Sequence, residues 1–275
     1  MNEMTARRGI TGSTLKLIAI TAMLIDHIGA AVVERMMMAS GYMEAAMESQ
    51  AALTAWIGEH GMLAMTDMGM RYIGRIAFPI FCFLLVEGFQ RTRDVRKYAL
   101  RLGLFALISE VPFDLTFSGQ LLEFRYQNVF FTLFLGLLAM MAADWVRKQN
   151  LHFLVTAALD IGVLAAGIAA AEFLRTDYAG SGVLCIMAMY FFRQRRGWQV
   201  LAGLAALLAG CYVLLGGLGM VISEITAVFG FLLIYRYNGE RGIRLKYVFY
   251  AFYPVHLLIL YGICMLMGIQ GIVIR

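Results

Sequence analysis

The stretch from Leu15 to Val33 most constrains the fold, because it is a long apolar run that contains two ionisable residues. It reads LKLIAITAMLIDHIGAAVV, and a helix of this length, at about 1.5 Å per residue, crosses a hydrocarbon layer of about 30 Å. Asp26 and His27 stand side by side in its second half. A charged side chain at membrane depth costs roughly 2.5–3.5 kcal/mol, so it usually faces a protein interior or a wet cavity. The stretch therefore predicts a membrane-spanning helix with an inward polar group, which serves either helix packing or a functional site.

The rest of the chain repeats this apolar character. Of 275 residues, 61% are hydrophobic and 15% are charged, whereas soluble domains have about 25% charged residues. Hydropathy predicts an all-α, polytopic membrane bundle of about nine spans, near residues 15–35, 71–90, 98–117, 127–144, 152–172, 179–192, 198–216, 218–236 and 248–270. With no long polar stretch, residues 1–275 are predicted to form a single domain.

Lysine and arginine predict the orientation of the bundle. Most of the 23 basic residues fall in alternate connections, around 91–97, 147–148, 193–196 and 236–246, together with the N-terminal segment. The positive-inside rule then places the N-terminus in the cytoplasm. The net charge of +5 is no signal of nucleic-acid binding, because these residues lie in short loops between spans. Arg7 and Arg8 also fit a cleavable signal peptide, but no small-residue cleavage site follows the first run, which favours a retained span.

The longest connection, residues 36–69, falls on the outer side and is rich in methionine. Apolar residues within YMEAAMESQAALTAWI share one helical face, which predicts an interfacial helix over the outer mouth of the bundle. A mobile polar loop is the alternative.

Ionisable and polar residues recur at a similar depth in several spans. Counted from the predicted helix ends, they form a layer in the outer half of the bundle: Arg71, Arg75, Glu110, Asp114, Gln127, Asn128, Asp177, Tyr178 and Glu224. By the same count His256 lies roughly 12 Å from the inner face, below the plane of His27 at roughly 18 Å. All three prolines, Pro79, Pro112 and Pro254, lie near these residues. The layer predicts a polar cavity inside the bundle.

The residue types favour acyl transfer over the other chemistries considered. Histidine titrates near neutral pH and is a natural general base for an amine or hydroxyl. Adjacent helical residues point about 100° apart, so Asp26 is not expected to orient His27, and Glu110 or Asp177 is a better candidate partner. Arg71 and Arg75 fit either an oxyanion or carboxylate contact or interfacial snorkelling. The sequence has no zinc-type histidine spacing and no GxSxG elbow, so we expect no metal and no serine nucleophile.

A basic rim follows on the predicted inner side, in RTRDVRKYALR (91–101), RQRR (193–196) and RYNGERGIRLK (236–246). Topology and attraction to anionic lipids are the simple explanation. The alternative is a dock for the phosphates of a cytosolic acyl donor, with Arg91, Arg101, Arg196, Arg241 and Arg244 as candidate contacts.

The chain resembles the TraX family of membrane proteins, named for the conjugal-transfer acetylase that N-acetylates pilin. The resemblance runs from about Gly12 to Met267, and its strongest stretches are LKLIAITAMLIDHIG, RYIGRIAFPIFCFLLVEGFQRTR, KYALRLGLFALISEVPFDLTF, QNVFFTLFLGLL and KYVFYAFYPVHLLILY. It implies kinship in layout with transmembrane acyltransferases, in which acyl groups pass from coenzyme A to an acceptor across the bacterial cytoplasmic membrane.

This resemblance implies His27 as the catalytic histidine, with Asp26, Arg75, Glu110 and Asp114 around it, and Asn128, Asp177 and His256 lining the cavity. Acetyl-CoA is the expected acyl donor, and a peptide amine, an amino sugar or a hydroxyl is the expected acceptor. The rival hypothesis is a secondary transporter whose buried His, Asp and Glu residues relay protons. The sequence lacks the paired halves with matching broken helices that are typical of transporters.

Overall fold

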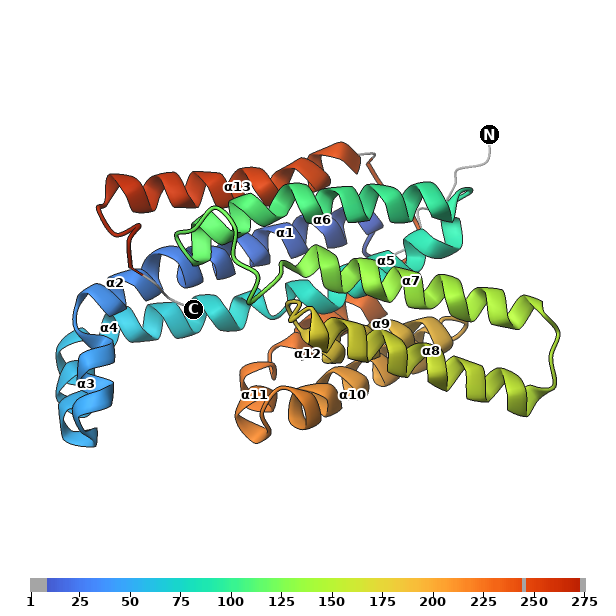
Figure 1. Ribbon diagram of the computed structural model, residues 1–275, viewed down its shortest axis with the longest axis horizontal. Helices are drawn as coiled ribbons and strands as arrows, with labels where there is room; N and C mark the ends of the chain where they lie inside the picture. The colour runs from blue at the N-terminus through green and yellow to red at the C-terminus, as the bar shows by residue number, and fades with distance from the viewer. Residues whose placement is uncertain (1–8, 244–245, 273–275) are drawn as a thin grey trace.

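The computed structural model describes residues 9–243 and 246–272. This part of the chain is a bundle of helices without a β-strand (Figure 1). Its elements are α1 (Gly12–Ile28), the π-helical segment η1 (Gly29–Val33), α2 (Glu34–Ala39), α3 (Tyr42–Glu48), α4 (Gln50–Gly74), α5 (Ala77–Arg91), α6 (Val95–Phe117), α7 (Val129–Lys148), α8 (Phe153–Phe173), α9 (Ala179–Phe191), α10 (Arg196–Leu214), α11 (Leu218–Ser223), α12 (Ala227–Tyr235) and α13 (Lys246–Leu266).

The predicted all-α membrane fold is confirmed. Six helical segments of the described residues are long and apolar enough to cross a bilayer, namely Gly12–Ala39, Gln50–Arg91, Val129–Lys148, Phe153–Phe173, Arg196–Leu214 and Val248–Leu266. The chain is thus a multi-pass membrane protein, while the number of about nine spans and the orientation of the N-terminus stay predictions.

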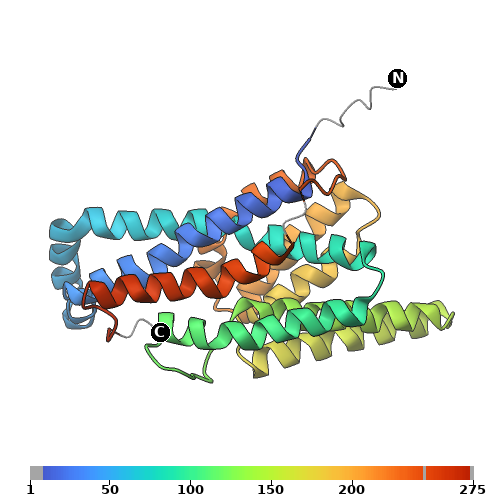
Figure 2. The ribbon, with the colours of Figure 1, turned by 90° about the horizontal axis from the view of Figure 1, so that it is seen from above.

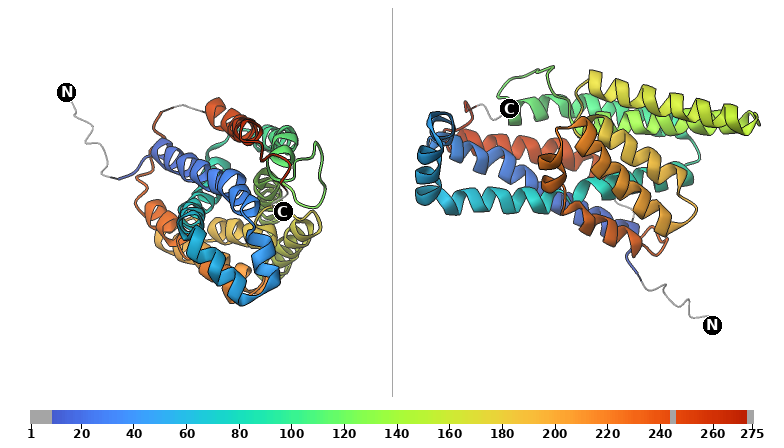
Figure 3. Two further views of the ribbon diagram at one scale, coloured as in Figure 1. Left: turned by 90° about the vertical axis from the view of Figure 1, so that its left-hand side faces the viewer. Right: turned by 90° about the horizontal axis from the view of Figure 1, so that it is seen from below.

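Two predicted boundaries differ from the structure. The connection 36–69 is helical rather than a loop. α4 is kinked at His60: the part before the kink lies beside α3 across the end of the bundle, and the part after it packs lengthwise on α1 and η1 and runs on towards α5 (Figures 1 and 3). The segment of the predicted interfacial helix, residues 42–57, corresponds to α3 and the first part of α4, and its place at a membrane interface stays a prediction. The predicted span 218–236 is broken into α11 and α12 at Glu224.

Polar side chains fix the beginnings of several helices. The side chains of Thr11, Ser49, Asp94 and Asn128 accept hydrogen bonds from the backbone N–H groups of the first turns of α1, α4, α6 and α7. Each bond satisfies an N–H group that has no partner within the helix.

The helices that matter for the site surround α1. In the view from above, α1 runs between α4 and α13, and α6 lies beside α13 (Figure 2). The hydroxyl of Thr116 on α6 donates to the carbonyl of Leu257 on α13 at 2.9 Å, which ties these two helices together. On the other side, α5 packs against α1, α9 and α12. This arrangement puts the polar residues of α1, α4, α6 and α13 into one interior.

Close packing of α12 on α5 depends on Gly230. A methyl group built at this position would lie 2.6 Å from the carbonyl oxygen of Ile76 and 2.7 Å from Cγ of Pro79. We expect Gly230→Ala to lower the free energy of unfolding by about 1–3 kcal/mol, because the rigid Ile76 carbonyl and the Pro79 ring would have to move. Thermal unfolding in detergent measures this, with Gly162→Ala as the control, since nothing lies within 4 Å of the methyl group there. Equal melting temperatures for the two variants would contradict the prediction.

Candidate functional site

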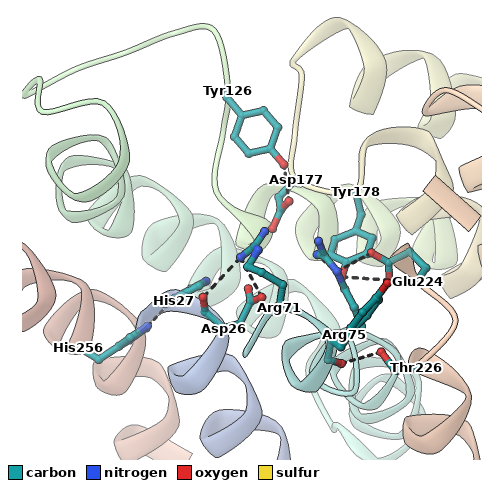
Figure 4. Close-up of polar contacts among 11 residues, drawn as sticks. Asp26, His27, Arg71, Arg75, Tyr126, Asp177, Tyr178, Glu224, Thr226 and His256 are labelled. Carbon is teal, nitrogen blue, oxygen red and sulfur yellow. Dashed lines mark hydrogen bonds and ion pairs between the residues drawn. The ribbon is translucent and has the colours of Figure 1, made fainter. Parts of the chain in front are cut away.

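His27 and His256 form a hydrogen-bonded pair in the interior of the bundle. The Nδ1 atom of His27 lies 2.7 Å from Nε2 of His256, and the two rings are nearly parallel, at 8° (Figure 4). The other nitrogen of His256, Nδ1, lies 2.8 Å from the carbonyl oxygen of Phe252. The prediction that His256 lies below the plane of His27 is wrong, because the structure brings the rings together.

These two contacts select the tautomers of the neutral rings. A carbonyl oxygen only accepts, so Nδ1 of His256 carries the proton and its Nε2 carries the lone pair. Nδ1 of His27 must then donate to that lone pair. In neutral His27 the remaining nitrogen, Nε2, has the lone pair, which is the form a general base requires.

Aromatic rings surround this pair. The edges of Phe117 and Tyr253 meet the His27 ring, with ring centroids 5.5 and 5.9 Å apart, and Tyr253 also meets His256 at 5.6 Å. Two residues after His27, α1 passes into the π-helical segment η1. Such segments are frequent at functional sites, because they change the direction of the side chains that follow.

Asp26 points to a different neighbour from His27, as the helical geometry predicts. Its Oδ1 accepts a hydrogen bond from Nη1 of Arg71 on α4 at 2.8 Å. The close approach of α4 requires Gly74, where a methyl group would lie 2.3 Å from the Asp26 side chain. Asp26 therefore links α1 to α4 through Arg71 rather than orienting His27.

Arg75, one turn beyond Arg71, enters a second ion pair. Its Nε lies 3.1 Å from Oε1 of Glu224, which is 2% exposed and sits in the break between α11 and α12. The Tyr178 hydroxyl lies 3.5 Å from both Arg75 Nη1 and Glu224 Oε2 (Figure 4). A buried carboxylate of this kind is stable only with such partners, so Arg75 is a packed ion-pair residue and not a snorkelling one.

Tyr178 is held in place by an unusual backbone. Its φ angle is 62°, in the left-handed region that non-glycine residues rarely adopt. The ring stacks on Phe78 with centroids 3.6 Å apart, and the carbonyl accepts from the Ser181 hydroxyl at 2.6 Å. Strain of this kind persists where the surroundings determine the conformation, and it often marks functional sites.

The remaining carboxylates of the predicted layer have partners of their own. Glu110 accepts from the side chain of Asn128, Asp114 accepts from the backbone N–H of Glu123 at 2.8 Å, and Asp177 accepts from the Tyr126 hydroxyl. The first two bonds join α6 to the segment before α7, and the third joins that segment to the turn before α9. The pairing of Glu110 or Asp177 with His27 stays a prediction.

A cavity of about 480 Å³ opens at the end of the bundle where the basic segments gather. Lys16, Arg91, Arg93, Arg101 and Arg241 are among its lining residues, and Met23, Phe130 and Tyr253 line it as well. We call it the basic cavity. Gly12 and Met23 both border it, eleven residues apart on α1, so it extends about 16 Å along the helix.

The candidate phosphate contacts divide into three groups. Arg91, Arg101 and Arg241 line the basic cavity directly. Arg196 lies beside it, with its Nη2 3.4 Å from Oε1 of Glu87, a lining residue. Arg244 lies outside the described residues.

A second cavity, of about 240 Å³, adjoins Arg71 and Arg75 at the end of α4. It is lined by Asp67, Met68, Arg71, Tyr72, Arg75 and Ser223, and we call it the arginine cavity. Met23 borders the basic cavity, whereas a methyl group at Gly29 would meet Asp67 and Arg71 at 3.4 and 3.6 Å. Asp26 and His27 therefore lie on α1 between the two cavities. Within residues 9–243 and 246–272, no three His, Cys, Asp or Glu side chains cluster as a metal site requires.

Sequence reasoning missed two residues of this site. Tyr253 joins the basic cavity to both histidines, but its only signal was its position three residues before His256. Asp67 lies one helical turn before Arg71, within residues 36–69, which the hydropathy pattern assigns to an outer connection. The missing information was that α4 already includes Asp67 and carries it alongside α1.

Comparison with known proteins identifies relatives of the whole bundle. The sequence model of the TraX protein family matches residues 11–264. A probable fimbrial assembly protein FimC, serogroup H1, from Dichelobacter nodosus is 32% identical over 207 residues, which cover 70% of this chain and 81% of that protein. No solved structure matches the chain.

Proposed function

Because the chain belongs to the TraX family, we propose that it is a membrane acetyltransferase that takes its acetyl group from acetyl-CoA in the basic cavity. One observation carries this proposal: the basic cavity leads from a group of cationic side chains to Tyr253, whose ring meets both His27 and His256. A charged, phosphate-bearing end and a narrow, mostly apolar arm are the two parts of coenzyme A that such a cavity fits.

In this proposal the arginines hold the donor. Arg91, Arg101 and Arg241 bind the phosphates at the cavity mouth, and the pantetheine arm extends past Met23 and Phe130. Burial of this arm among apolar side chains directs the thioester towards the histidine pair.

His27 then acts as the general base. Its Nε2 takes the proton of the acceptor N–H or O–H while the acceptor atom bonds to the thioester carbonyl carbon. The C–S bond breaks, and the coenzyme leaves as a thiol after it receives that proton. His256 acts as a positioning residue: it keeps the proton of His27 on Nδ1 and fixes the ring plane.

The acceptor arrives from the other side of His27. The arginine cavity adjoins this side. His27 lies on α1 between the two cavities, and this position supports transfer from one cavity to the other. The named function of the Dichelobacter nodosus relative supports an acceptor among the proteins of a pilus or fimbria.

Acetyl-CoA binding tests the proposal. We expect the melting temperature of the detergent-purified protein to rise with acetyl-CoA concentration, because a ligand that binds only the folded state stabilises it. A flat response up to millimolar acetyl-CoA would overturn the proposal and favour the proton-coupled transporter.

Removal of two cationic contacts should weaken donor binding. We expect Arg101→Ala combined with Arg241→Ala to raise the Kd for acetyl-CoA at least tenfold, because each lost charge-assisted bond is worth about 1.5–3 kcal/mol. Isothermal titration measures the Kd. Arg96→Ala is the control, since this exposed arginine lies near the same end of the bundle but does not line the cavity. Equal affinities for the double variant and the control would contradict the assigned phosphate contacts.

A further inference from the structure

The connection between α12 and α13 is bound to the start of α1. Residues 236–243, which we call the strap, follow α12 and lie beside the first residues of α1 (Figure 2). Among the described residues, four backbone hydrogen bonds of 2.8–3.0 Å join the two segments: the N–H groups of Ile10, Gly12 and Ser13 donate to the carbonyls of Arg236, Glu240 and Arg241, and the N–H group of Asn238 donates to the carbonyl of Ile10. The first turn of a helix has no internal partner for its N–H groups, so the strap completes the beginning of α1.

The strap is also a wall of the basic cavity. Tyr237 and Arg241 line this cavity, and Gly12 at the start of α1 lines it as well. The ring of Tyr237 meets the ring of Phe83 on α5 with centroids 5.2 Å apart, which fixes the beginning of the strap. The position of Arg241, one of the proposed phosphate contacts, then depends on how the end of the strap is attached to α1.

Ser13 and Gly242 make this attachment. The Oγ atom of Ser13, a residue that is 5% exposed, accepts a hydrogen bond from the backbone N–H of Ile243 at 3.1 Å. Gly242 has a φ angle of 69°, in the left-handed region that favours glycine. A methyl group at residue 242 would overlap Ser13 Oγ and lie 2.8 Å from Oγ1 of Thr11. A side chain at this position would therefore push the strap away from α1.

We infer that Ser13 and Gly242 are positioning residues for the acyl donor. Neither lines the basic cavity, but together they hold the strap against α1 and so keep Arg241 at the cavity wall. A guanidinium group binds phosphate most tightly when its N–H groups are already in place, because any ordering of the strap on binding is subtracted from the affinity. The inference rests on the proposed function, which makes acetyl-CoA the ligand of this cavity.

Donor binding to glycine variants of the full-length protein in detergent is the first test. We expect Gly242→Ala to raise the Kd for acetyl-CoA about tenfold or more, because the strap and Arg241 are displaced. Gly239→Ala is the matched control within the strap: residue 239 also has a positive φ angle, of 86°, but nothing lies within 4 Å of an added methyl group. This variant keeps the backbone carbonyl that accepts from Nη2 of Arg91 at 2.9 Å. Its Kd should rise by no more than about threefold.

Ser13→Ala tests the same attachment without adding volume, and it keeps the test decisive if Gly242→Ala does not fold. We expect its Kd for acetyl-CoA to rise about three- to tenfold, because the N–H group of Ile243 loses its acceptor. Thr14→Ala is the control. It removes an exposed hydroxyl from the next residue, which binds the hydroxyl of Thr11 at 2.9 Å instead of the strap, so the wild-type Kd should be retained.

Steady-state kinetics separate positioning of the donor from packing of the bundle. His27 lies fourteen residues beyond Ser13 on α1, about 21 Å away, so kcat at saturating acetyl-CoA should stay within about twofold while the KM for acetyl-CoA rises. A fall in kcat at unchanged KM would overturn the inference, as would equal Kd values for each variant and its control. A wild-type protein that does not respond to acetyl-CoA would instead overturn the proposed function.

Discussion

His27→Ala should lower the rate of acetyl transfer by about 10²–10⁴-fold and leave the Kd for acetyl-CoA within about twofold of the wild-type value. General-base catalysis by a positioned side chain contributes a factor of this size. The donor affinity is preserved because His27 is not among the residues that line the basic cavity. Transfer of labelled acetyl groups to the acceptor measures the rate, and isothermal titration measures the affinity.

Two further variants make this result specific. His27→Gln keeps a hydrogen-bonding side chain that can donate to His256 but has no basic nitrogen, so its rate should be as low as that of the alanine variant. His152→Ala removes an exposed histidine that begins α8, and it should transfer at the wild-type rate. Full transfer by His27→Gln would exclude His27 as the base.

Replacement of His256 should have the second largest effect. We expect His256→Leu to lower kcat by about 10²-fold with little change in the KM for acetyl-CoA, because Nδ1 of His27 loses its hydrogen-bond acceptor. The ring can then rotate and carry its proton on either nitrogen. Loss of the partner that orients a metal-binding histidine costs about 10–100-fold in activity, and we expect a similar factor for a histidine that acts as a base.

A conservative variant distinguishes positioning from packing. His256→Gln supplies an amide oxygen that can accept from His27 Nδ1, so it should recover a large part of the activity that the leucine variant loses. The kcat and KM values of both variants, with their melting temperatures, provide the measurement. Equal losses of kcat in the leucine and glutamine variants, at equal stability, would contradict the positioning role.

The chemistry of individual spans could be read from the sequence, because ionisable residues are rare and costly within apolar runs. This reasoning selected His27, Arg71 and Arg75, and it separated Asp26 from His27 by helical geometry. The short helix α9 was also anticipated at residues 179–192, and the structure has it at Ala179–Phe191.

The contacts between spans could not be read in the same way. Depth was counted from the ends of apolar runs, which assumes that all helices begin at one level. The backbone N–H groups of Gly12 and Ser13 instead bind the carbonyls of Glu240 and Arg241, several residues before α13 begins. His27 lies 15 residues after the start of α1 and His256 lies 10 residues after the start of α13, yet their rings are in contact, so the two helices begin at different levels.

The break between α11 and α12 escaped prediction for a related reason. Hydropathy is uniform across residues 218–236 except at Glu224, and one charge does not distinguish a straight span from an interrupted one. Only the partner, Arg75 in the turn between α4 and α5, shows why the chain turns there. Pairing of distant charges is a property of the packed bundle.

The placement of Asp26 and His27 between the two cavities has a consequence for the side of the membrane on which coenzyme A is used. Coenzyme A is a large, multiply charged nucleotide that bilayers retain. Under the proposed function, the donor is held at one face and the acceptor at the other, so only a two-carbon fragment would have to traverse the barrier and the nucleotide would stay on its own side for recharging. An acceptor outside the cytoplasm would then be acetylated without an exported supply of activated precursor.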